Sequence, residues 1–102
     1  MIRIYDAAFE NSNGSHHSHL ATFWWIDNNG ITGIWTRQQA YNYVVANPGM
    51  VYVAEGNVSV IVMPYYYTSN TSVQWIQTQS DGILKDNLTT LAIRRSQGLI
   101  NN

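Results

Sequence analysis

The chain has 102 residues, a length typical of one domain with a single hydrophobic core. Hydrophobic residues make up 45% of it and aromatic residues 13%, but only 11% are charged, against roughly 25% in an average soluble domain. The formal net charge of −1 argues against an extended nucleic acid as partner, because binding a polyanion requires a dense field of Lys and Arg. Weak charge repulsion between copies favours self-association instead, so we expect a homo-oligomer.

The absence of cysteine excludes disulfides and thiolate metal sites, and no phosphate-cradling glycine loop is present. No apolar run approaches the ~20 residues that span a bilayer, so we expect no membrane partner. The N-terminus shows no basic segment followed by an apolar run, which is the pattern of a secretory leader. We therefore expect a cytoplasmic domain without a cofactor.

The first half of the chain predicts two strands and a further extended piece. Ile2 to Phe9 alternates apolar with other residues, and Leu20 to Ile26 is a second strand rich in aromatics. Between them, residues 10–18 are polar and rich in turn formers, which predicts a mobile loop. Asp27 to Gly30 forms a turn in which Asn and Gly supply positive φ angles, and Ile31 to Trp35 is short and extended.

A short helix is predicted next. Thr36 and Gln39 have the spacing of a capping box, in which each side chain bonds the backbone N–H of the other residue. The apolar residues that follow at helical spacing are Ala40, Tyr41, Val44 and Val45. Asn47, Pro48 and Gly49 end the helix, because proline cannot continue it and glycine tolerates the left-handed conformation of a helix terminus.

The second half of the chain predicts three more strands. Alternating valines on either side of the turn Glu55 to Asn57 indicate a hairpin, and they are Val51, Val53, Val58, Val60 and Val62. Pro64 places the end of this hairpin at a sheet edge or a bulge, because proline cannot donate to a ladder. Residues 68–72 are a polar loop, and Val73 to Thr78 is the last clear strand.

After that strand, Ser80 to Gly82 turns the chain, and Asp86 to Leu88 opens a segment that is either a short helix or an extended tail. Residues 96–102 are expected to fray. We therefore expect one domain over residues 1–102, with an ordered core over about residues 2–92. Its class is α+β: a curled, mainly antiparallel sheet of about five strands with one short helix packed on it.

Residues 75–91, W-I-Q-T-Q-S-D-G-I-L-K-D-N-L-T-T-L, resemble the end of a small, mainly bacterial family known as domain of unknown function 3892. The shared features are an aromatic-apolar strand, an Asp-Gly turn and an Asp-Asn-Leu segment, which fall on Trp75, Ile76, Thr78, Asp81, Gly82, Asp86, Asn87, Leu88 and Leu91. The order of elements upstream also fits, so the resemblance covers residues 2–92. It implies a fold and no activity. This chain departs from the family in its long His-containing loop and in its tail after Leu91.

His16, His17 and His19 form the metal-type cluster of the sequence. Imidazoles bind Zn, Ni or Cu, but these three lie in a Ser- and Asn-rich loop without a rigid frame or a carboxylate at ligand spacing. A solvated loop is the simpler interpretation, so we expect no metal. A hydrolase that uses His19 is disfavoured because no nucleophile elbow or orienting group accompanies it, so we expect no enzyme.

The aromatic residues are the strongest indication of a binding function. Four Trp and seven Tyr exceed what a small core buries with every indole and phenol group paired. Exposed rings line either a subunit interface or a pocket in which they stack on a planar base, with Arg94 or Arg95 on its phosphates. Asp86 and Asn87 either cap local amides or bond a ligand's hydroxyls or base edge. The candidate ligand-binding residues are Trp24, Trp25, Trp35, Trp75, Tyr66, Asp86, Asn87, Arg94 and Arg95.

These features favour a non-catalytic, homo-oligomeric domain that sequesters or senses a small nucleotide-derived ligand, as a phage protein would to remove a defence signal. The alternative is a protein-interaction or inhibitor module that acts through an aromatic surface. The first hypothesis places the ligand in a pocket at or near the subunit interface, whereas the second requires an exposed aromatic edge.

Overall fold

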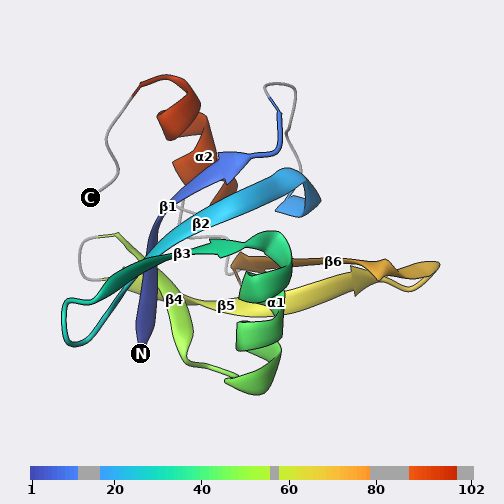
Figure 1. Cartoon of the computed structure of the whole chain (residues 1–102), viewed down its shortest axis with the longest axis horizontal. Helices are drawn as coiled ribbons and strands as arrows, with labels where there is room; N and C mark the ends of the chain where they lie inside the picture. The colour runs from blue at the N-terminus through green and yellow to red at the C-terminus, as the bar shows by residue number, and fades with distance from the viewer. Residues whose placement is uncertain (12–16, 56–57, 79–87, 99–102) are drawn as a thin grey trace.

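The computed structural model describes residues 1–11, 17–55, 58–78 and 88–98 (Figure 1). The elements in chain order are β1 (Ile2–Phe9), the 3₁₀ turn η1 (His17–His19), β2 (Leu20–Asp27), β3 (Thr32–Thr36), α1 (Arg37–Ala46), β4 (Val51–Glu55), β5 (Val58–Tyr67), β6 (Asn70–Thr78) and α2 (Leu88–Ser96). The strands of the described part form one mixed sheet in the order β3-β2-β1-β4-β5-β6, which does not close into a barrel. The α+β class is confirmed, and the short extended piece before the helix is a sixth strand, β3.

Helix α1 begins at the predicted capping box. The Thr36 hydroxyl accepts a hydrogen bond from the Gln39 amide at 3.2 Å, and the Gln39 side chain accepts one from the Thr36 amide at 2.9 Å. The helix ends where Asn47 donates its backbone N–H to the Tyr43 carbonyl at 2.9 Å. Ala40 and Val44 are buried as predicted, but Val45 is 52% exposed because it falls one position beyond the stripe that faces the sheet.

Two short stretches of strand pairing hold the sheet together, one along β5 and one between β1 and β4. β5 changes partner along its length: Val58–Ile61 pairs with β4, and Val62–Tyr67 pairs with β6. Pro64 lies in the second half, which has one neighbouring strand in the described part, as its predicted edge position requires. β1 and β4 are parallel neighbours over the two pairs Ile2↔Val51 and Arg3↔Tyr52. Short overlaps of this kind let the sheet twist strongly, so it curls around its core.

The two helices hold this curled sheet together (Figure 1). α1 contacts β2 and β3 near one edge of the sheet and β5 and β6 near the other, and α2 packs on β1. Both helices contribute to one core, with Ala40 and Val44 from α1 and Leu88 and Leu91 from α2. The final segment is therefore a helix rather than an extended tail, and it continues to Ser96, beyond the boundary expected near residue 92.

Three predictions for the loops and turns can be compared with the structure. β6 begins at Asn70 rather than Val73, because the ladder with β5 continues past a register shift to the pair Tyr67↔Asn70. In the turn after β2, the Asp27 carboxylate accepts the amides of Asn29 and Ile31, each at 2.9 Å, and of the turn residues only Gly30 has a positive φ. Most of the turn predicted at residues 55–57, the turn predicted at residues 80–82 and most of the loop predicted over residues 10–18 lie outside the described residues.

Gly33 is required by the Trp25 ring. These residues are a cross-strand pair of β2 and β3, and the ring lies over the glycine so closely that a Cβ there would come within 2.3 Å of Trp25 Cζ2. A side chain at this position would displace an indole that belongs to the packing of α1 against the sheet.

We predict that Gly33→Ala lowers the free energy of unfolding by about 1–3 kcal/mol, the usual cost of forcing extra volume into a packed site. Urea denaturation followed by tryptophan fluorescence measures the change. Thr32→Ala on the same strand is the control, because the Thr32 side chain is exposed. Equal stability of the two variants would show that the Trp25 ring yields freely.

Candidate functional site

An irregularity in β1 places a carboxylate on the outer face of the sheet. Ile4 pairs with Trp25 and Ala7 with Phe23, but a register shift between Ile4 and Asp6 inserts one extra residue between them. Asp6 thus stands opposite Trp24. Because side chains alternate along a strand and Ala7 and Phe23 lie in the core, Asp6 and Trp24 share the face turned away from it.

Arg95 of α2 joins these two residues. Its Nη1 donates to Asp6 Oδ2, and its guanidinium carbon lies 4.0 Å from the centre of the Trp24 ring, in a cation–π contact. The other carboxylate oxygen of Asp6 accepts the Ala7 amide at 2.9 Å. The Asp6 side chain is 9% exposed and the Arg95 side chain 45% exposed. The guanidinium is thus held by a buried anion and a ring while one side of it faces solvent.

A pocket of about 420 Å³ opens beside this arginine, between the end of β1 and α2. Its described lining residues are Ala8, Phe9, Asn11, Ala92, Ile93, Arg95 and Ser96. A volume of this size lies within the usual range for small-molecule sites, about 300–1,000 Å³. The lining combines a phenyl ring, small apolar side chains, an amide, a hydroxyl and one cation, which suits a ligand with a flat body and an anionic group.

Two of the predicted ligand residues, Trp25 and Trp35, lie on the other side of the sheet. Their ring centres are 5.4 Å apart, and the Trp35 ring is 4.8 Å from that of Tyr43 on α1. The indole N–H of Trp25 is buried without a hydrogen-bond partner among the described residues, so packing alone fixes this ring. These rings attach α1 to β2 and β3 and do not line the pocket.

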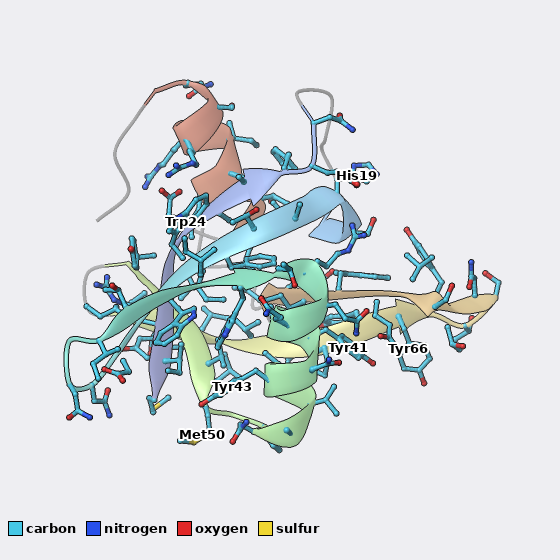
Figure 2. The ribbon with its side chains drawn as sticks, viewed as in Figure 1. His19, Trp24, Tyr41, Tyr43, Met50 and Tyr66 are labelled. Carbon is cyan, nitrogen blue, oxygen red and sulfur yellow. The ribbon has the colours of Figure 1, made fainter. Side chains whose placement is uncertain are left out.

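Trp75 and Tyr66 belong to the hairpin formed by β5 and β6. Trp75 is buried between the rings of Tyr65 and Tyr67, at centre distances of 6.1 and 4.8 Å. Tyr66 is 53% exposed and lies in another part of the molecule from Trp24 (Figure 2). The tryptophans are thus divided among three places, and Trp24 is the one that contacts Arg95 of the predicted set.

The remaining candidates are placed as follows. Arg94 is partly buried on α2 and is not among the pocket residues, whereas Asp86, Asn87 and His16 lie outside the described residues. His17 and His19 belong to η1 and are not among the described lining residues of the pocket, and His19 is exposed. Within the described ranges, no three His, Cys, Asp or Glu side chains are grouped as a metal site would need.

Sequence reasoning missed Asp6, Phe9, Asn11 and Ser96. Asp6 carried a usable signal, because a lone carboxylate inside an otherwise apolar strand requires a partner when it is buried. The other three carried none, since their meeting depends on where α2 packs.

No protein-family model, curated protein or solved structure matches the chain, so the resemblance to domain of unknown function 3892 stays a prediction. Neither α-helix of the described part is long and apolar enough to cross a bilayer.

The Asp6–Arg95 pair can be tested by a double-mutant cycle. We predict that Asp6→Asn lowers stability by about 1–3 kcal/mol, because it removes a charge-assisted bond to a nearly buried group. Combined with Arg95→Gln, the cycle should give a coupling free energy of about 0.5–3 kcal/mol, measured by urea denaturation. Additive effects of the two substitutions would show that the ion pair contributes nothing to folding.

Proposed function

We propose that this chain is a non-catalytic binding domain for a small planar anion of the nucleotide-derived class, acting as a homo-oligomer in the cytoplasm. The observation that carries the proposal is the half-exposed side chain of Arg95, which lines a ligand-sized pocket and is held by Asp6 and Trp24. An arginine held in this way loses little conformational entropy when it binds, and a guanidinium matches phosphate geometry with parallel N–H groups.

The charge of the site limits the charge of the ligand. Asp6 offsets the charge of Arg95, and no carboxylate or second cation is among the described lining residues. A triphosphate would therefore bring several uncompensated negative charges into the pocket. A phosphodiester or a cyclic monophosphate carries a single negative charge. Phe9 is the aromatic residue of the lining against which a base would stack, and Asn11 and Ser96 are polar residues of the same lining.

The polar groups of the pocket favour binding over catalysis. The Ser96 hydroxyl donates to the Ile93 carbonyl at 2.7 Å, and the described lining residues include no imidazole or carboxylate to activate it. Among these described lining residues, a bound nucleotide would meet donors and a ring but no general base. Retention of an unchanged ligand is the chemistry such a pocket supports.

We predict that Arg95→Gln weakens ligand binding about 10- to 100-fold, because a hydrogen bond to a charged group contributes about 1.5–3 kcal/mol. A thermal-shift screen of cyclic, linear and dinucleotide phosphodiesters identifies the ligand, and titration calorimetry measures its affinity. Arg3→Gln is the control, since it removes the same charge from β1 outside this pocket.

Two outcomes would count against the proposal. If no compound in the screen shifts the melting temperature, the nucleotide class is excluded. If Arg95→Gln and Arg3→Gln weaken binding equally, the ligand responds to net charge and the pocket is not its site.

A second candidate function follows from the hairpin of β5 and β6, which extends away from α1 (Figure 1). Met63, Tyr66 and Tyr67 on it are 39%, 53% and 42% exposed. No charged residue occurs from residue 63 to 77, and Tyr, Ser, Thr and Asn dominate that stretch. Exposed tyrosines among small polar residues resemble the contact surfaces of protein-binding loops. This surface supports the alternative of a protein-interaction or inhibitor module.

For this alternative, we predict that immobilised protein retains one stoichiometric partner and that Tyr66→Ser with Tyr67→Ser abolishes the retention. Exposed tyrosines contribute most of the affinity in such contacts, so the loss should exceed 10-fold. Val45→Ser is the control, because Val45 is equally exposed but lies on α1. Retention of the partner by the double variant would exclude the hairpin as its binding surface.

A further inference from the structure

The two edges of the sheet differ in how they are covered. α1 contacts the strands at both edges, β3 and β6, but β6 also contacts η1. β3, at the other edge, pairs with β2 on one side, and no described strand pairs with its other side. Ile31 and Ile34 on this edge are 59% and 60% exposed, which is high for isoleucine beside a sheet.

The register identifies the backbone groups that point away from β2. Asp27 donates its amide to the Ile31 carbonyl at 2.9 Å, so these residues face each other as a hydrogen-bonded pair. The alternation of an antiparallel ladder then assigns Gly33 and Trp35 to bonds with β2, and turns the N–H and C=O of Thr32 and Ile34 outward. Thr36 follows the same rule, because its amide donates to the Gln39 side chain and not to β2.

β3 lacks the charge, the proline and the bulge that block many exposed edge strands. Natural edge strands are blocked by Lys, Pro, bulges or covering segments. Residues 31–36 read I-T-G-I-W-T, without a charge or a proline, and the pairing of β3 with β2 continues through five residue pairs without a register shift. An uncharged strand that is regularly paired on one side, with outward donors and acceptors on the other, is suited to pairing with another strand.

We propose that β3 pairs antiparallel with β3 of a second copy of this chain, about a two-fold axis at Gly33. This inference rests on the homo-oligomer of the proposed function and gives it an interface. In this register Thr32 of one copy faces Ile34 of the other, twice over. The outward N–H and C=O groups of both residues are then satisfied in both copies, by four intermolecular hydrogen bonds.

The chemistry of the edge favours a second copy over a foreign strand. The register is self-complementary, and a strand without charge meets its own copy without repulsion. The low net charge of −1 also keeps the electrostatic repulsion between two copies weak. Ile34 stands opposite Trp24 on the outer face of the sheet, so the axis brings the exposed isoleucines of both copies onto one apolar surface.

The first test is the oligomeric state by sedimentation velocity. We expect a dimer for the unaltered chain and a rise of at least 10-fold in its dissociation constant for Ile34→Lys, because lysine at an edge opposes pairing. Val45→Lys is the matched control and should remain dimeric, since Val45 is similarly exposed on α1. Thr32→Pro is a second variant: it removes an outward donor and no bond to β2, and it should also yield monomer with unchanged circular dichroism.

The second test reads the register by cross-linking, and the absence of native cysteine makes it free of background. A mixture of Thr32→Cys and Ile34→Cys chains should form a disulfide dimer under mild oxidation, since facing residues lie within disulfide reach. Neither variant alone should form the disulfide, because the same residue in the two copies forms a diagonal pair about 7–8 Å apart.

The outcomes separate this inference from the function on which it rests. A monomeric unaltered chain overturns the homo-oligomer and the interface together, and leaves the edge to a foreign strand. A dimer that Ile34→Lys and Thr32→Pro leave intact, without the mixed cross-link, overturns the β3 interface alone. Ligand binding is measured separately by calorimetry, so its failure does not bear on the edge.

Discussion

The parallel pairing of β1 with β4 covers Ile2↔Val51 and Arg3↔Tyr52 in the described residues, and the rest of the structure depends on how this narrow junction is supported. Two ladder pairs do not hold two halves of a sheet, so buried side chains must. Leu88 and Leu91 of α2 enter the same core as Ile4 and Phe23, on the side of β1 where the pairing with β4 has ended. α2 thus supports the sheet beside this short pairing, and its position there brings Arg95 to Asp6.

The extra residue in β1 near Tyr5 determines which face of the sheet Asp6 lies on. Without it, the strict alternation of β1 would keep Asp6 on the face of Ile2 and Ile4, where a carboxylate would enter the apolar core. The extra residue changes the phase of the strand, so Ala7 enters the core and Asp6 moves to the outer face beneath Arg95. One inserted residue thus converts a destabilising charge into the anchor of the candidate site.

Residues close together in the sequence predicted most of the fold but few of the contacts in the candidate site. The capping box, the valine alternation and the Pro64 edge position are encoded by residues near one another in sequence, and the structure has them as predicted. The division of the tryptophans was predictable in part, since adjacent residues of a strand, such as Trp24 and Trp25, must face opposite sides. That Trp24 would meet Arg95, more than seventy residues later, depends on a helix whose existence the sequence left open.

Trp24 links the candidate site to the exposed edge. Its ring lies against the guanidinium of Arg95 on one side, and its strand position is opposite Ile34 on the other. In the proposed complexes, a ligand bound to Arg95 would lie beside the group that covers this ring, and a second copy would add a strand next to β3, the neighbour of the strand that carries it. Coupling between two sites is reciprocal by thermodynamic necessity. If the proposed dimer favours the ligand-bound state, the ligand therefore favours the dimer by the same free energy. Trp24 is the described residue that both contacts Arg95 and pairs with Ile34 at the β3 edge.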